Sequence, residues 1–161
     1  MTSAPEPVHE PAPEADLGTG GPDDPVRIHV GGIWQLGDAL VLVRRGHGAA
    51  GGVWALPGGA VRAGETLAEA VVRSVVEQTG ADALCGPFVG WSEVVDDGPH
   101  VVTMHFEVVV LDPPEHDRRS GAIAGAPEDA RVTPVWEVTE VPLVAGLAEL
   151  LADQDLIELV I

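Results

Sequence analysis

The sequence predicts an α/β or α+β fold in which a mixed β-sheet lies between two helices. Three observations support this prediction. The continuous apolar run Ala39–Val43 is typical of a strand that is buried on both faces. The segment Thr66–Thr79 has the clearest helical pattern in the chain. The expected elements follow in the order of three strands, a helix, three strands and a helix, with short turns between most of them.

Three short strands are expected before the first helix. Gly37-Asp38 has the composition of a hairpin turn between the first two strands, and residues 44–52 form a glycine-rich loop after the second. The third strand leads directly into Pro57-Gly58-Gly59, where the chain is expected to turn tightly. The expected strands are Arg27–Trp34, Ala39–Val43 and Trp54–Leu56.

The first helix carries signals for both of its ends. Thr66 is a suitable N-cap, and Glu69 three residues later completes a capping box. Gly80 is suited to end the helix in the left-handed conformation. Helical periodicity predicts one buried apolar stripe made of Ala68, Val71, Val72, Val75 and Val76. Because valine has weak helix propensity, the helix is expected to depend on packing against a sheet.

The second half of the chain is expected to hold three further strands and a helix. Asp96 to Pro99 has the composition of a turn between the first two of these strands. Residues 112–130 form a long polar loop that either shapes a pocket or is a simple insertion. The expected elements are strands at Phe88–Val95, Val101–Leu111 and Arg131–Val138 and a helix at Leu143–Asp153.

The charge balance excludes several classes of partner. The 161 residues carry 26 acidic and 8 basic side chains, all eight of them arginine, for a net charge of −18. Such a surface repels DNA, RNA and anionic membranes, so a long nucleic acid or a membrane is not an expected partner. A small phosphate ligand is compatible with it, because one or two arginines or a metal reverse the field locally.

The first 25 residues differ from the rest in composition. They hold six prolines and six acids with almost no large apolar side chain, so we expect a disordered tail before a single domain at residues 26–161. This segment lacks the features of a signal peptide, and no apolar run has the length of a membrane helix. The single cysteine, Cys85, is compatible with a cytoplasmic protein.

One motif carries the functional information. Between Gly59 and Gly80 the sequence places Glu65, Arg73 and Glu77 at fixed offsets. This spacing resembles the Nudix box, the G-x5-E-x7-R-E-U-x-E-E-x-G-U signature of enzymes that hydrolyse nucleoside diphosphates linked to another group. WALPGG before the box and RVTPVWEV near the C-terminus are similar to the same family, so the resemblance covers roughly residues 26–153. It implies an α/β/α sandwich and, by family habit, a possible homodimer.

The resemblance also implies a metal site on the helix. Carboxylates at positions i, i+3 and i+4 of one helix can share Mg²⁺ or Mn²⁺, which neutralises the diphosphate and activates water. In this chain the three positions are Ser74, Glu77 and Gln78, so only one carboxylate remains. The carbonyl of Gly59 is a further metal ligand that the family implies. We therefore expect weak binding of the ion unless acids from elsewhere contribute; those available are Glu93, Asp96, Asp97, Glu128 and Asp129.

Other residues receive roles from the same resemblance. Glu65 and Arg73 are similar to a pair that ties the loop to the helix, and Glu128 stands where relatives often place a further catalytic acid. The arginines that could meet phosphates or substrate are Arg44, Arg45, Arg62 and Arg73, and Trp34 is the tryptophan that would stack on a base.

Two functions remain open from the sequence. In the first, the chain is a metal-dependent hydrolase of a nucleoside diphosphate linked to another group. In the second, it is a catalytically inactive module of the same fold that binds a nucleotide or a protein. The substitutions at Ser74 and Gln78 are the reason for the second.

Overall fold

The computed structural model describes residues 25–46, 52–95 and 98–159. Residues 1–24 of the predicted tail, residues 47–51 of the predicted glycine-rich loop and the Asp96-Asp97 part of the predicted turn lie outside these residues. The elements, in chain order, are β1 (Arg27–Ile33), β2 (Gln35–Leu36), β3 (Ala39–Arg45), β4 (Val53–Ala55), β5 (Gly58–Ala60), α1 (Leu67–Thr79), β6 (Ala83–Val94), β7 (Val101–Val110), β8 (Ala130–Pro134), a 3-10 turn (Val138–Glu140) and α2 (Leu147–Asp153).

The strands form two four-stranded sheets rather than one. The first has the order β5-β1-β7-β6 and is mixed, because β1 runs parallel to β7 whereas β5 and β6 lie antiparallel to their neighbours. The second is built around β3, which pairs antiparallel with β2, β4 and β8. The predicted mixed α+β architecture is therefore correct, with its strands divided between two sheets.

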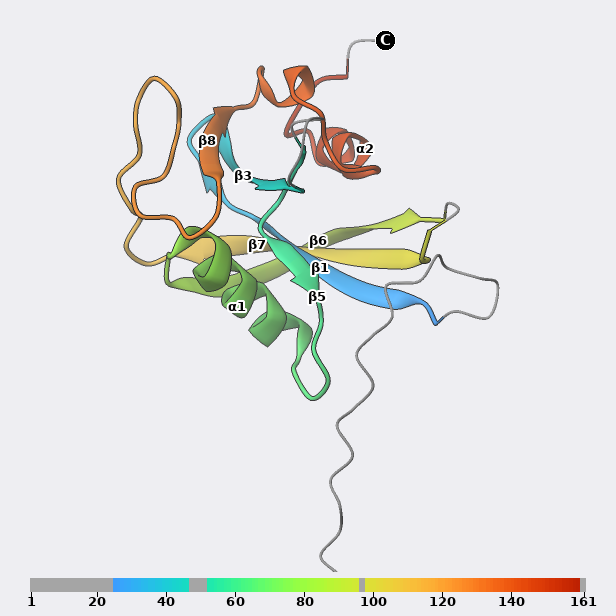
Figure 1. The fold of residues 1–161 in the computed structure, drawn as a ribbon. Helices are drawn as coiled ribbons and strands as arrows, with labels where there is room; N and C mark the ends of the chain where they lie inside the picture. The colour runs from blue at the N-terminus through green and yellow to red at the C-terminus, as the bar shows by residue number, and fades with distance from the viewer. Residues whose placement is uncertain (1–24, 47–51, 96–97, 160–161) are drawn as a thin grey trace, which may run out of the picture.

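Two helices cover opposite sides of the structure (Figure 1). Strand β3 contacts both apolar layers, because Val41 and Val43 belong to the cluster beneath α1 whereas Leu40 and Leu42 belong to the cluster beneath α2. All four side chains are completely buried. This alternation follows from the period of two along a strand, and it confirms the prediction that Ala39–Val43 is buried on both faces.

The ends of α1 agree with the sequence signals. The Thr66 hydroxyl accepts a hydrogen bond from the Glu69 N–H, the Glu69 carboxylate accepts one from the Thr66 N–H, and Gly80 ends the helix with φ of 77°. The short glycine turn and the capped helix after it therefore fix the positions of the box residues Glu65, Arg73 and Glu77.

The C-terminal part of the chain departs from the prediction. Helix α2 begins at Leu147 instead of Leu143, because Leu143 forms a bridge with Trp54 and Val144 donates a backbone hydrogen bond to the Trp54 carbonyl. Strand β8 ends at Pro134. The long loop before it is tied back by a bridge between Ala122 and Arg131. Within the described residues, no helix is long and apolar enough to cross a membrane.

Candidate functional site

The turn before α1 brings two stretches of backbone into close contact. Gly58 pairs with Gly31 in the β1–β5 ladder, and Gly32 donates a backbone hydrogen bond to the Pro57 carbonyl. A Cβ atom on Gly58 would lie 2.0 Å from the Val30 carbonyl oxygen. Glycine is therefore required at position 58 by this close approach, and the contact fixes the loop against β1.

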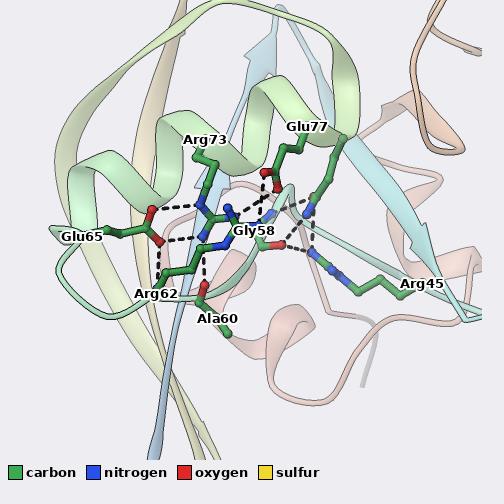
Figure 2. Close-up of polar contacts among 8 residues, drawn as sticks. Arg45, Gly58, Ala60, Arg62, Glu65, Arg73 and Glu77 are labelled. Atoms are coloured by element: carbon green, nitrogen blue, oxygen red, sulfur yellow. Dashed lines mark hydrogen bonds and ion pairs between the residues drawn. The ribbon is translucent and has the colours of Figure 1, made fainter. Parts of the chain in front are cut away.

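Glu65 and Arg73 tie this loop to the helix, as the sequence predicts (Figure 2). Arg73 donates to both Glu65 oxygens, from Nη2 at 2.6 Å and from Nε at 2.9 Å, and Nη2 also donates to the Ala60 carbonyl at 3.0 Å. The hydrogen bond from Arg73, followed by that from the Arg62 backbone N–H, lowers the pKa of Glu65 from 4.5 to about 2. The pair thus stays ionised at neutral pH and holds the loop in position.

Glu77 is the remaining carboxylate of the box, and it is already paired. Its Oε2 accepts a hydrogen bond from Arg73 at 3.1 Å, and its Oε1 accepts one from Arg62 at 3.3 Å. The Glu77 side chain is 47% exposed. Solvent therefore weakens both pairs, and the carboxylate remains accessible to a ligand.

Ser74 lies in the core instead of at a metal site. Its side chain is 0% exposed, and its hydroxyl has no hydrogen-bond partner among the described residues. The buried face of α1 is rotated from the predicted stripe, since Ala68 is exposed and Val76 is 39% exposed. The buried face consists of Ala70, Val71, Ser74, Val75, Gln78 and Thr79. The predicted stripe is therefore correct for Val71 and Val75 and wrong for Ala68 and Val76, and the prediction of Ser74 as a metal ligand is wrong.

We expect Ser74→Ala to raise the free energy of unfolding by about 1 kcal/mol, because it removes a buried hydroxyl that lacks a partner. Thr79→Val is the matched control. The Thr79 hydroxyl is also buried, but it donates to the Val75 carbonyl at 2.7 Å and accepts from the Ala81 N–H. Its removal should destabilise by about 1 kcal/mol. Urea denaturation measures both changes; a loss of stability in Ser74→Ala would contradict this account.

Gln78 joins the helix to the glycine turn and to Arg45. Its Nε2 donates to the Gly58 carbonyl at 2.6 Å, and its Oε1 accepts from the Gly58 N–H at 3.0 Å. Arg45 Nη2 donates to the same carbonyl, and it also lies 3.4 Å from the Gln78 Oε1 and 3.4 Å from the Leu56 carbonyl. The Arg45 guanidinium thus lies among the oxygen atoms of Leu56, Gly58 and Gln78, beside the C-terminal end of α1 (Figure 2).

A cavity of about 470 Å³ opens beside this arginine. The cavity is lined by Arg45, by Gly59 and Ala60 of β5, and by residues of β1, β4, β6, β7 and the segment that leads into α2. Its volume lies within the usual range for a small-molecule site. The residues lining it are His29, Val30, Gly31, Arg45, Ala55, Leu56, Gly59, Ala60, Ser92, Val94, Val101, Thr103, His105, Val144, Ala145 and Leu147.

His105 is a cavity residue that the sequence reasoning missed. It is 4% exposed, its Nε2 lies 3.0 Å from the Ser92 hydroxyl, and its Nδ1 has no hydrogen-bond partner within the part of the chain that the structure describes. Burial lowers the pKa of His105 to about 4, so the ring is neutral at neutral pH. A histidine in the middle of the largely apolar strand Val101–Val110 was the available signal.

Of the remaining predicted residues, Arg45 and Gly59 reach the cavity and Trp34 does not. Trp34 is 2% exposed within the core, so the prediction that it stacks on a base is wrong. Arg44 pairs with Asp129 at 2.9 Å. Trp91 and Trp136 are more than half exposed.

Glu128 lies next to Gln78, near the C-terminal end of α1. Its backbone N–H donates to the Gln78 carbonyl at 3.4 Å. Burial lowers the pKa of Arg45, and the charge of Glu128 opposes that shift. The exposed Glu128 carboxylate is thus the acid whose charge acts on Arg45. Glu93 pairs with His100 instead.

These residues do not fit a divalent metal ion at the box. Ser74 faces the core, Gln78 is held by Gly58, and Glu77 is paired with two arginines. In the described parts of the chain, no group of three His, Cys, Asp or Glu side chains is placed to hold a metal. A hard cation needs several oxygen ligands, of which carboxylates supply the attraction, and here one carboxylate is available.

Comparison with known proteins relates this geometry to a family. A model described as the NUDIX domain matches residues 25–154. An ADP-ribose pyrophosphatase of Methanocaldococcus jannaschii is 30% identical over 120 residues, which are 73% of this chain and 66% of that protein. The chain therefore spans just under two thirds of the length of this curated relative.

Solved structures support the fold alone. A MutT protein from Methanosarcina mazei has a TM-score of 0.66 at 23% identity, covering 83% of this chain and 95% of that one. An ADP-ribose pyrophosphatase from Streptococcus suis has a TM-score of 0.57 at 20% identity, covering 78% and 87%. At these identities the shared architecture is the conclusion.

Proposed function

The chain belongs to the NUDIX family, and from this premise we propose that it is a pyrophosphohydrolase acting on a nucleoside diphosphate linked to another group. The family match and the relative named ADP-ribose pyrophosphatase support this activity. The observation that carries the proposal is the cavity beside the box, which both Arg45 and Gly59 line. ADP-ribose is the first substrate to test.

The cavity suits the two ends of such a substrate. Arg45 supplies positive charge for the diphosphate, and an arginine fork matches the geometry of phosphate oxygens. Farther along the cavity, Ser92, Thr103 and the neutral His105 offer hydrogen-bonding groups between apolar walls, which is the composition that a nucleoside needs. A small nucleotide therefore fits both the charge and the volume.

Two carboxylates are available for a base in the reaction. Glu77 is exposed on the box helix, and Glu128 lies within the electrostatic range of Arg45. Either could accept a proton from an attacking water once it faces the diphosphate. Arg44 and Arg62 are retained as substrate contacts in this proposal, although each is paired with a carboxylate in the structure.

Binding without cleavage is the second candidate function. It is favoured by the loss of carboxylates at Ser74 and Gln78, which removes most of the attraction for the divalent ion that this family generally uses. Under this alternative the cavity recognises the nucleotide, and the diphosphate bond stays intact. A homodimer and a cytoplasmic location remain predictions under both candidates.

Turnover and binding measurements separate the two candidates. ADP-ribose, nucleoside diphosphate sugars and oxidised nucleotides are incubated with Mg²⁺, with Mn²⁺ or with EDTA, and the nucleoside monophosphate released is measured by chromatography. We expect release with at least one substrate. Calorimetric binding without any release at high protein concentration would reject the hydrolase and leave the binding module. Neither binding nor release would reject both.

We expect Glu77→Gln to abolish turnover, because it removes a carboxylate that would accept a proton from the attacking water. The melting temperature should change little, because the Glu77 carboxylate is exposed and its pairs are screened by solvent. Glu115→Gln, an exposed acid on the long loop, is the matched control and should keep full activity. Retention of turnover in Glu77→Gln would show that the remaining box carboxylate is dispensable and would assign the role of base to another residue, with Glu128 first.

A further inference from the structure

We propose that the guanidinium of Arg45 takes the place of a divalent cation in this site, so that the chain holds the diphosphate of its ligand without metal. This inference rests on the proposed function, because it assumes that a diphosphate enters the cavity beside Arg45. In this arrangement a side chain fixed on β3 supplies the positive charge that an exchangeable metal ion would otherwise supply.

The oxygen atoms around Arg45 define this cation position. They are the carbonyl oxygens of Leu56 and Gly58 and the Gln78 Oε1, all of which are approached by a single nitrogen, Arg45 Nη2. Carbonyl and amide oxygens are the neutral ligands that a hard cation accepts. Here the positive charge that they stabilise belongs to the protein. Because the guanidinium already lies among these oxygens, an ion would have to displace it.

Gln78 complements an arginine at this position better than a carboxylate would. The Gly58 carbonyl accepts from the Gln78 Nε2, a donor that glutamate lacks. Glutamine is also neutral, so it contacts Arg45 without forming an ion pair, whereas a carboxylate at this position would pair with it directly. The glutamine at position 78, which weakens a metal site because it replaces the box glutamate, thus also keeps Arg45 available for an anion.

Arg45 also excludes a metal ion from its surroundings. At a given short distance near a protein surface, a unit positive charge repels a divalent ion twice as strongly as it repels a monovalent one. One box carboxylate, Glu77, cannot offset the repulsion, since it is already shared between Arg62 and Arg73. The local field therefore favours the diphosphate and opposes the ion.

Arg45 retains donors for a ligand. An arginine has five N–H donors, and the contacts described above all involve Nη2. In the described part of the chain, Arg45 has no carboxylate within ion-pair distance. Since Arg45 lines the cavity, its remaining donors can reach phosphate oxygens there.

Isothermal titration calorimetry of the full chain with ADP-ribose tests this inference. Affinity in EDTA should equal that in Mg²⁺ within about twofold. Arg45→Met should weaken binding by about tenfold or more in both buffers, and Arg45→Lys should restore part of it. Arg119→Met removes an exposed arginine from the long loop and should bind as the wild type does. If Mg²⁺ is required for binding, the inference fails and the proposed function stands.

Direct ion binding provides a second readout. Electron paramagnetic resonance with Mn²⁺ alone should show no bound ion in the wild type, and binding should appear when Arg45→Met is combined with Gln78→Glu. Stoichiometric Mn²⁺ in the wild type that Glu77→Gln removes would overturn the inference. If no nucleotide of the panel binds in either buffer, the proposed function fails and this inference fails with it.

Discussion

Gly58→Ala should destabilise the chain by about 3 kcal/mol or more, the largest effect that we expect from a single methyl group. The added Cβ atom would lie 2.0 Å from the Val30 carbonyl oxygen and 2.9 Å from the Gly31 Cα, and both contacts are with backbone. Neither neighbour can move without breaking the β1–β5 register. Because Gly58 also bonds to Gln78, the change should loosen the helix as well as the turn.

Gly98→Ala is the control for this change. A Cβ atom at position 98 meets no described residue within 4 Å, so the stability of this variant should stay within about 0.5 kcal/mol of the wild type. Urea denaturation followed by circular dichroism measures both variants. A Gly58→Ala protein with the midpoint of the wild type would contradict the close approach on which the position of the site depends.

Arg73→Ala should reduce the free energy of unfolding by about 2 kcal/mol, because it removes several charge-assisted hydrogen bonds that join the loop to the helix. The bonds lost are those to Glu65, Glu77 and the Ala60 carbonyl. Arg62→Ala is the control. Its single bond to Glu77 is at the surface, so its effect should stay below about 0.5 kcal/mol.

The pH dependence of stability tests the same network. The pKa of Glu65 is lower in the folded chain, about 2, than its ordinary value of 4.5. The stabilisation from this group is therefore complete above pH 4.5 and is lost as the pH falls toward 2. Arg73→Ala should lack most of this loss in a series of thermal melts. An equal decline in both proteins would assign the acid sensitivity to other groups.

Much of the frame of this site could be predicted from local sequence signals. The capping box at Thr66, the terminal Gly80 and the paired Glu65 and Arg73 all lie where their spacing places them. Each of these features depends on residues within one helix or on its adjoining turn. Such short-range interactions form between residues close in sequence, so they can be predicted without knowing how the helix packs against the sheets.

The face that α1 buries could not be predicted from its valines. Packing on β5 and β6 selects Ser74 and Gln78 for the interior, because the Gly58 backbone offers Gln78 both a donor and an acceptor. Periodicity counts apolar residues and does not include such long-range hydrogen bonds. The rotation leaves Val76 exposed and buries a serine hydroxyl without a partner.

The cavity likewise depends on contacts that are distant in sequence. Arg45 reaches Gly58 and Gln78 from β3, and His105 and Ser92 arrive on two other strands. No local pattern connects these residues. Trp34 was misassigned for the related reason that an aromatic residue beside a predicted turn can face either a ligand or the core, and packing alone decides between them.

The most direct test of the central claim is a crystal structure with a non-hydrolysable ADP-ribose analogue in the presence of Mn²⁺. We predict that the diphosphate lies in the cavity within hydrogen-bond distance of Arg45, beside Gly59, and that anomalous scattering shows no manganese bound by Glu77 and Gln78. A manganese ion held by these two side chains with Arg45 turned away, or an analogue bound outside the cavity, would contradict the account.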